Sequence, residues 1–154
     1  MSEALEAEER AAALDSLGGV LGEAGAAALD GPREQLAGSL LRAAFVLWED
    51  PQVRPKLLGI LKAAVNGKEG AEQMRGFLAS QLFAEAGKAI GIAGMDIYQA
   101  AETLKVPAIN INAAAGQVWG VVLLRYVVEL EPIASASSEE LIDLLTPTIQ
   151  RYLG

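Results

Sequence analysis

Residues 107–130, PAININAAAGQVWGVVLLRYVVEL, form the most apolar stretch of the chain. Proline suits the first turn of a helix, and no charged side chain occurs from residue 106 to residue 124, so the pattern predicts one long helix. The alternation of isoleucine and asparagine at residues 109–112 is too short to predict a strand. The run is about as long as the roughly 20 residues that cross a bilayer. A buried helix is favoured over a membrane span because four residues are costly in hydrocarbon: Pro107, Asn110, Asn112 and Gln117.

Gly116 and Gly120 lie one turn apart in this predicted helix and therefore share one strip of its surface. A glycine weakens a helix by about 1 kcal/mol relative to alanine, which suggests that another helix packs closely against the strip. Two interpretations remain open: packing inside the monomer, or a symmetric dimer made with the C-terminal helix. The dimer interpretation predicts an interface of Gly116, Gly120, Leu123, Val127, Leu141, Leu145 and Ile149.

Helical periodicity extends outward from this segment over almost the whole chain. Apolar residues make up 52% and aromatic residues only 5%, which favours helices over a sheet. Proline, glycine and capping residues such as Asp96 divide this periodic pattern into separate helices. Residues 137–140 fit a capping box, and Asn66-Gly67 fits a left-handed C-terminal cap. The glycines within residues 18–25 are expected to make the chain less regular after the first helix. The prediction is an all-α helical bundle of six or seven helices, at about residues 3–17, 32–48, 55–65, 69–88, 96–104, 107–130 and 139–153.

Acidic residues are concentrated near the N-terminus. Residues 1–30 hold seven acidic side chains and one basic one, a net charge of −6 out of −8 for the chain. DNA binding depends on cationic side chains that displace counterions from phosphates, so this segment should repel DNA. Residues 31–154 are close to neutral. We therefore divide the chain into an acidic, Ala-rich helical segment, 1–30, and a second domain, 31–154.

The chain contains no cysteine and no histidine. Disulfides, Cys- and His-based catalytic relays and the usual zinc ligands are therefore excluded, and no phosphate-binding glycine loop is present. Carboxylate pairs such as Asp96 with Glu102 are explained as exposed charge. We expect neither an enzyme nor a metal or cofactor site. Because no export signal is recognisable, a cytoplasmic protein is expected.

A ligand cavity needs large apolar side chains and a few polar groups that fix orientation. Phe77 and Gln81 share one helical face, and Met74 lies one turn before Phe77. Gln117 and Trp119 point in roughly opposite directions, so no more than one is expected on a given wall. Each of these residues is also explained as ordinary core. The predicted cavity lining is Trp48, Met74, Phe77, Gln81, Gln117 and Trp119.

Three parts of the chain together resemble a known family. They are LLRAAFVLWEDP at residues 40–51 followed by RPKLL at 54–58, QVWGVVLLRYVV at 117–128, and EPIAS at 131–135 with PTIQRYL at 147–153. In this order they resemble the C-terminal regulatory domain of TetR-family transcriptional repressors, over roughly residues 32–154. The resemblance implies an all-α domain that dimerises through its last two long helices, about 109–130 and 139–153. It also implies a cavity for a small, usually hydrophobic effector between the preceding helices.

Repressors of this family begin with a DNA-binding helix-turn-helix of about fifty residues, whose second helix enters the major groove. Residues 1–30 are too short for that unit, contain no aromatic residue and carry the wrong charge. We therefore expect this chain to be a homodimeric regulatory domain that binds a small hydrophobic effector and does not itself bind DNA. The alternative is a stand-alone ligand-binding protein, or a partner that forms heterodimers with a full-length regulator.

Overall fold

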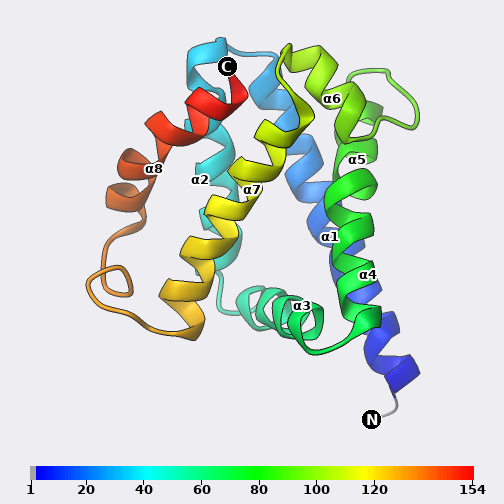
Figure 1. Ribbon diagram of the computed structural model, residues 1–154, viewed down its shortest axis with the longest axis vertical. Coiled ribbons are helices and arrows are strands. Elements are labelled where there is room, and N and C mark those ends of the chain that lie inside the picture. The colour runs from blue at the N-terminus through cyan, green and yellow to red at the C-terminus, as the bar shows by residue number, and fades with distance from the viewer. Residues whose placement is uncertain (1–2) are drawn as a thin grey trace.

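The computed structural model describes residues 3–154, which fold into helices and contain no strand (Figure 1). Because α4, η2 and α5 form one continuous rod and η3 continues α7, these residues make seven helices, and the all-α prediction is confirmed. In chain order the elements are α1 (Glu3–Leu29), η1 (Arg33–Gln35), α2 (Leu36–Glu49), α3 (Arg54–Asn66), α4 (Lys68–Gly76), η2 (Phe77–Gln81), α5 (Leu82–Ala89), α6 (Ile97–Leu104), α7 (Ala108–Val122), η3 (Leu123–Val127) and α8 (Ser138–Leu153).

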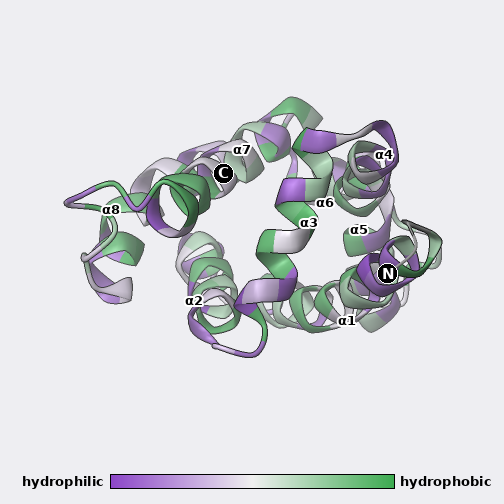
Figure 2. Cartoon of the chain, turned by 90° about the horizontal axis from the view of Figure 1, so that it is seen from below, coloured by the Kyte–Doolittle hydropathy of each residue, from purple (hydrophilic) through white to green (hydrophobic). Residues whose placement is uncertain are grey.

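The helices form a bundle that is closed at one end by α3. In the end-on view of Figure 2, α1 and α2 lie on one side, α4 and α7 lie on the other, and α3 runs between them. At the opposite end of the bundle, α6 leads into α7 (Figure 1). α8 lies outermost, beside α2 and α7. This arrangement leaves the space between α1, α2, α5 and α7 to be filled by side chains.

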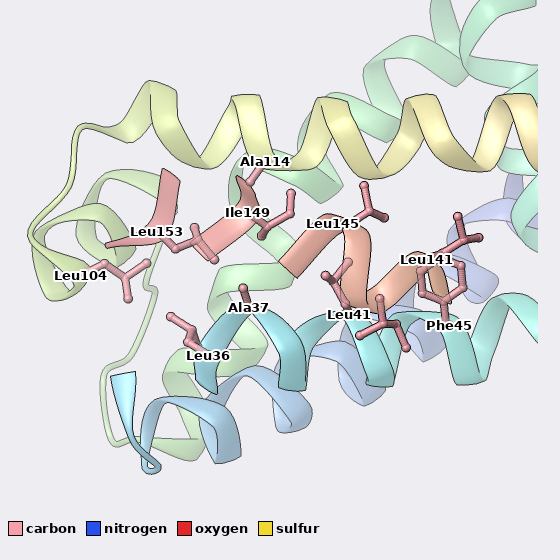
Figure 3. Packing of buried hydrophobic residues seen from close by; sticks show 11 residues of the cluster. Leu36, Ala37, Leu41, Phe45, Leu104, Ala114, Leu141, Leu145, Ile149 and Leu153 are labelled. Atoms are coloured by element: carbon pink, nitrogen blue, oxygen red, sulfur yellow. The ribbon is translucent and has the colours of Figure 1, made fainter. Parts of the chain in front are cut away.

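The buried apolar residues gather in three clusters. The largest joins α2 to α8 under α7 and is shown in Figure 3; among its members are Leu36, Leu41, Phe45, Ala114, Leu141, Leu145, Ile149 and Leu153. A second cluster, around Trp48, Ile60 and Phe77, connects α1, α2, α3 and η2. A small third cluster surrounds Met95 between α5 and α6. The core is therefore divided rather than continuous.

The first helix is longer than predicted, since α1 continues through the glycine-rich stretch to Leu29. The prediction of a loosened chain at residues 18–25 is wrong because two of these glycines face other helices. A Cβ atom on Gly22 would lie 2.7 Å from the Cβ of Glu85, and one on Gly18 would lie 3.4 Å from the ring of Phe77. The glycines let the α4–η2–α5 rod approach α1 closely instead of ending the helix.

The predicted helix caps are confirmed at two positions and corrected at a third. The Ser137 hydroxyl accepts a hydrogen bond from the backbone N–H of Glu140 at 3.1 Å, which is one half of the predicted capping box, and Asp96 forms a complete capping box with Gln99. Gly67 is extended, with φ of −166°, and not left-handed. The reason is that α4 begins at the next residue and uses Gly67 as its own N-cap.

The long apolar helix predicted at residues 107–130 is α-helical as far as Val122 and π-helical from Leu123 to Val127. Residues 109–112 lie inside α7 and form no strand. Within residues 3–154, no single helix combines the length and the apolar composition that crossing a membrane requires. The pair formed by α6 and residues 108–127 meets both conditions only when taken together, with a bend of 104° between the two helices.

Candidate ligand-binding site

A pocket of about 270 Å³ lies where the three apolar clusters meet. None of its lining residues is charged, and Thr103 is the one lining residue with a polar aliphatic side chain. Leucines and alanines supply most of the wall. The lining residues are Leu17, Leu21, Gly22, Gly25, Leu29, Leu36, Leu40, Leu41, Ala44, Leu47, Trp48, Phe77, Leu78, Leu82, Phe83, Ala86, Met95, Ala100, Thr103, Leu104, Ile111, Ala114, Ala115, Val118, Trp119, Ile149 and Leu153.

α1 forms one wall of this pocket. Its lining residues recur at three- and four-residue intervals, which places them on one face of the helix: Leu17, Leu21, Gly22, Gly25 and Leu29. The acidic residues of α1 lie on its exposed surface, as at Glu8, Glu9 and Glu23. The domain division predicted at residue 30 falls in the turn between α1 and α2 and stays a prediction. In the structure, the first helix belongs to the wall of the site.

One end of the pocket is aromatic. The rings of Trp48 and Trp119 meet edge to face, with centroids 5.5 Å apart, and the ring of Tyr126 stacks on Trp48 with centroids 5.7 Å apart. Phe77 is the first residue of the π-helical segment η2 and is only 2% exposed. A π-helical turn shifts the register of a helix, so η2 changes which side chains of the α4–α5 rod face the interior.

The structure brings three of the six predicted lining residues to the pocket: Trp48, Phe77 and Trp119. Met74 packs half-buried against the aromatic cluster but does not reach the pocket. Gln81 lies outside the wall because its side-chain amide donates a hydrogen bond to the Asp15 carboxylate of α1. Gln117 also lies outside, as the opposite directions of Gln117 and Trp119 on one helix require. The Gln117 side-chain oxygen is buried without a hydrogen-bond partner.

Most of the actual lining residues had no distinguishing signal in the sequence. A leucine or alanine that faces a cavity sits in the same helical pattern as one that fills a core. The lining residues of α1 were missed for a second reason, since the glycines among them were interpreted as a break in the helix. Reading Gly18, Gly22 and Gly25 as a three- and four-residue repeat would have indicated a packed helical face.

A polar network lies beside the aromatic end of the pocket and joins α2 to η3 and α8. Arg125 and Arg54 donate to the Glu49 carboxylate at 2.9 Å and 3.1 Å, respectively. The Tyr126 hydroxyl donates to the same carboxylate at 2.7 Å, and the Ser138 hydroxyl does so at 3.4 Å. Glu49 of α2 therefore connects to three other helical elements, α3, η3 and α8, through one side chain.

Arg125 also fixes the connection between η3 and α8. Its guanidinium donates to the backbone carbonyls of Ile133 and Ala136 at 2.8 Å and 2.6 Å, and its side chain is only 9% exposed. The ordering of the loop before α8 thus depends on one buried cation that has a carboxylate partner and two carbonyl partners.

The pKa values in this network follow from the contacts. Partial burial by itself would raise the pKa of Glu49, but the hydrogen bonds from Tyr126 and Arg125, with the charges of Arg125 and Arg54, hold that pKa below its ordinary value. Burial, followed by the hydrogen bond to Glu49, raises the pKa of Tyr126 to about 12. At neutral pH the network therefore consists of an ionised carboxylate, a neutral phenol and two guanidinium groups.

The outer face of α7 and η3 is an exposed apolar strip, which we call the α7 strip: Ile109, Gly116, Gly120, Leu123, Leu124, Val127 and Val128. No atom of the described residues would lie within 4 Å of a Cβ placed on Gly116 or Gly120. The interpretation that these two glycines allow close packing inside the monomer is therefore wrong. They lie on the surface of the chain together with Leu123 and Val127.

The three α8 residues predicted for a dimer interface are buried within the chain, unlike the glycines and the apolar residues of the α7 strip. Leu141, Leu145 and Ile149 are 3%, 6% and 3% exposed, and they pack against α2 within their own chain (Figure 3). They have no surface left for a second copy, so this part of the prediction is wrong. The large apolar residue that α8 exposes is Leu144, at 70%.

No metal site accompanies the pocket. Residues 3–154 contain no group of three acidic side chains placed to hold a metal ion. The pocket wall carries no ionisable side chain, and in the neighbouring network the Glu49 carboxylate accepts hydrogen bonds from Arg125 and Tyr126. The arrangement can hold an apolar molecule against uncharged side chains.

Comparison with known proteins identifies the family. Residues 34–153 match the family model described as "Tetracyclin repressor-like, C-terminal domain". Neither the curated proteins nor the solved structures gave a match to the chain. The family match covers most of the chain and begins after α1. An all-helical bundle with an apolar pocket is consistent with it, and the chain belongs to the family of tetracycline repressor-like C-terminal domains.

Proposed function

We propose that this chain is a regulatory domain that binds a small hydrophobic effector in the pocket and pairs with a second copy through the α7 strip. Domains of this family generally dimerise and bind small-molecule effectors. The observation that carries the proposal is the pocket, an uncharged cavity of about 270 Å³ within the helical bundle. Its lining comes from α1, α2, η2, α5, α6, α7 and α8. Pockets of this kind, concave and mostly apolar, are the usual sites for small ligands.

Two glycine substitutions in α1 test the pocket. A Cβ on Gly25, which lines the pocket, would meet the Leu40 side chain at 3.8 Å, so Gly25→Leu places a bulky side chain into the pocket without a backbone clash. Gly19 lies on the same helix, outside the lining, with open space at its Cβ position. Gly19→Leu is therefore the matched control, since both changes favour the helix equally.

Native mass spectrometry of the purified chain gives the readout. We expect a small molecule to be retained, or taken up from an added mixture of apolar compounds, by the unsubstituted chain and by Gly19→Leu. Gly25→Leu should lose it. Retention that is equal in all three proteins would show that the molecule binds elsewhere and would contradict the pocket as the effector site.

The α7 strip supports pairing with a second copy. An exposed row of large apolar side chains with two glycines one turn apart allows another helix to approach closely. A two-fold axis would bring the same strip of each chain together.

Gly120→Leu tests this interface. Its Cβ position is open in the single chain, so the substitution leaves the monomer fold intact but blocks close approach of a partner helix. Gly59→Leu, on α3, is the control because Gly59 is also exposed with open space at its Cβ. Light scattering should show a dimer for the unsubstituted chain and for Gly59→Leu, and a monomer for Gly120→Leu. A dimeric Gly120→Leu protein would argue against the α7 strip as the dimer interface.

We also propose that the chain does not by itself bind DNA. Support comes from the exposed acidic residues of α1 and from a net charge of −8. Because phosphate contacts with cations supply most of the affinity for DNA, such a surface should be repelled. A gel shift at about 0.15 M salt should show no complex. A complex of nanomolar affinity would overturn this proposal.

A further inference from the structure

We propose that the pocket selects an uncharged, elongated molecule with a hydrocarbon skeleton of about eleven carbon atoms, which carries a hydrogen-bond acceptor such as a ketone or ester oxygen and no carboxylate. This inference rests on the proposed function of the pocket and specifies the chemical class of its ligand. It follows from three separate features of the wall: its charge, its hydrogen-bonding groups and its size.

The charge of the ligand follows from the absence of free cations at the wall. No lining residue is charged, and the arginines around the pocket already have partners. Arg54 and Arg125 bind Glu49, and the Arg33 guanidinium donates to the backbone carbonyls of Leu104 and Leu153 at the ends of α6 and α8. A carboxylate placed in this pocket would lose its hydration without gaining a counter-charge, which is strongly unfavourable.

Two arginine nitrogens without partners do not change this conclusion. The Nε atoms of Arg33 and Arg125 make no hydrogen bond, but both are buried beneath other atoms. A molecule in the pocket cannot reach them unless the arginine side chains leave the carbonyls and the carboxylate that they now bind. An anionic ligand would therefore have to break existing charge-assisted hydrogen bonds to bind.

Two side chains of the wall carry hydrogen-bond donors that no residue from 3 to 154 accepts. Trp48 and Trp119 both line the pocket, and neither indole N–H donates a hydrogen bond to any residue from 3 to 154. An indole N–H can only donate, so it suits an acceptor oxygen on the ligand. The Thr103 hydroxyl already donates to the backbone carbonyl of Gln99 at 3.0 Å. A carbonyl oxygen at the aromatic end of the pocket thus fits the available groups.

The size of the ligand follows from the volume. A dry apolar cavity of about 150 Å³ holds benzene, with six carbons, so a cavity of 270 Å³ has room for about eleven. The wall contributed by α7 runs from Ile111 to Trp119, a rise of about 12 Å along the helix. The lining along α7 therefore extends far enough to take an extended chain or a narrow ring system.

Tryptophan fluorescence provides the test, because the chain has two tryptophans and both line the pocket. The probes are 2-undecanone, the matched carboxylate undecanoate at pH 8, and the short ketone 2-pentanone. We expect 2-undecanone to bind at least about 100-fold more tightly than undecanoate, because the carboxylate would be buried unpaired. It should also bind at least about 100-fold more tightly than 2-pentanone, which buries six fewer methylene groups.

Gly25→Leu and Gly19→Leu make the outcomes distinguishable. Loss of the 2-undecanone signal in Gly25→Leu, with the signal kept in Gly19→Leu, supports the proposed class. Undecanoate binding as tightly as 2-undecanone, and blocked by Gly25→Leu, overturns the class but leaves the effector pocket standing. If no probe binds while native mass spectrometry shows another molecule retained, the class is again wrong. If no probe binds and no molecule is retained, the class and the pocket function fail together.

Discussion

α7 and α8 are both apolar helices of the C-terminal half, and they use their apolar residues in different ways. In α8, Leu141, Leu145 and Ile149 pack against α2, and Leu144 is the large apolar residue that is exposed. α7 lines the pocket with one face and leaves the α7 strip uncovered on the other. Helical periodicity shows that a face is apolar but not which surface covers it. The difference teaches that an apolar face can be assigned to an interface only after the chain's own packing is known.

The largest expected effect separates the two faces of α8. Leu141→Ala should lower the free energy of unfolding by about 2–5 kcal/mol, because Leu141 is buried between α2 and α8 and a cavity would remain. Leu144→Ala, at an exposed position, should change the stability of the monomer by less than about 0.5 kcal/mol. Urea unfolding followed by circular dichroism measures both.

Protein concentration adds a control to this pair. If Leu144 contacts a second copy, the effect of Leu144→Ala should grow with protein concentration, since association stabilises only the paired state. The effect of Leu141→Ala should not change with concentration. Equal losses for the two variants at low concentration would show that the two faces of α8 do not differ as described.

A smaller effect is expected at the joint between the two helices. Arg125→Met should lower the free energy of unfolding by about 1–3 kcal/mol, because Glu49 and the carbonyls of Ile133 and Ala136 lose a common donor. Arg54→Met removes a second partner of the Glu49 carboxylate. Because the Arg54 side chain is about one-third exposed, the free energy of unfolding should fall by less than about 1 kcal/mol. Hydrogen exchange should show faster exchange in residues 129–137 of Arg125→Met. Losses of equal size in the two variants would contradict the role given to Arg125.

The smallest effect is a dependence of stability on pH. The pKa of Glu49 is lower in the folded chain than in the unfolded chain, so its contribution to stability is complete above the ordinary value near 4.5. That contribution is lost as the pH falls through the lowered pKa. Because the Glu49 side chain is 36% exposed, the contribution is below about 1 kcal/mol. Thermal unfolding from pH 7 to pH 3 should show a steeper loss for the unsubstituted chain than for Glu49→Gln, and identical slopes would count against the network.

The sequence predicted the helices well because their signals are local. The proline before α7, the caps at Asp96 and Ser137 and the apolar periods of α2 and α8 each act within one or two turns. The glycines of α1 misled the prediction since their role depends on α5, which is more than fifty residues away in the chain. A glycine that permits close packing and one that ends a helix look the same in a single sequence.

The site was predictable only where a residue type is distinctive. Trp48, Phe77 and Trp119 stood out as large aromatic residues in a chain that has few, and all three line the pocket. Gln81 and Gln117 were chosen for their polarity, but Gln81 binds Asp15 at the surface and Gln117 lies off the wall. The volume of the pocket depends on the distances between helices. Those distances arise from tertiary packing and have no signature in hydropathy.

The π-helical segment η2 makes the number of residues, and not only their kind, critical for this fold. A π-helical turn contains one residue more than the surrounding α-helix needs, so deleting one residue from η2 would leave an unbroken rod. Such a deletion would let the segment close into α-helical turns while α4 and α5 keep their faces. A deletion in α4 or α5, which have no extra residue, would instead rotate the remainder of the rod by about 100°. α3 would turn as well, since Gly70 of α4 lies directly against the backbone of Ala63. A one-codon deletion in either α-helical part of the rod should therefore be more damaging than the same deletion in η2.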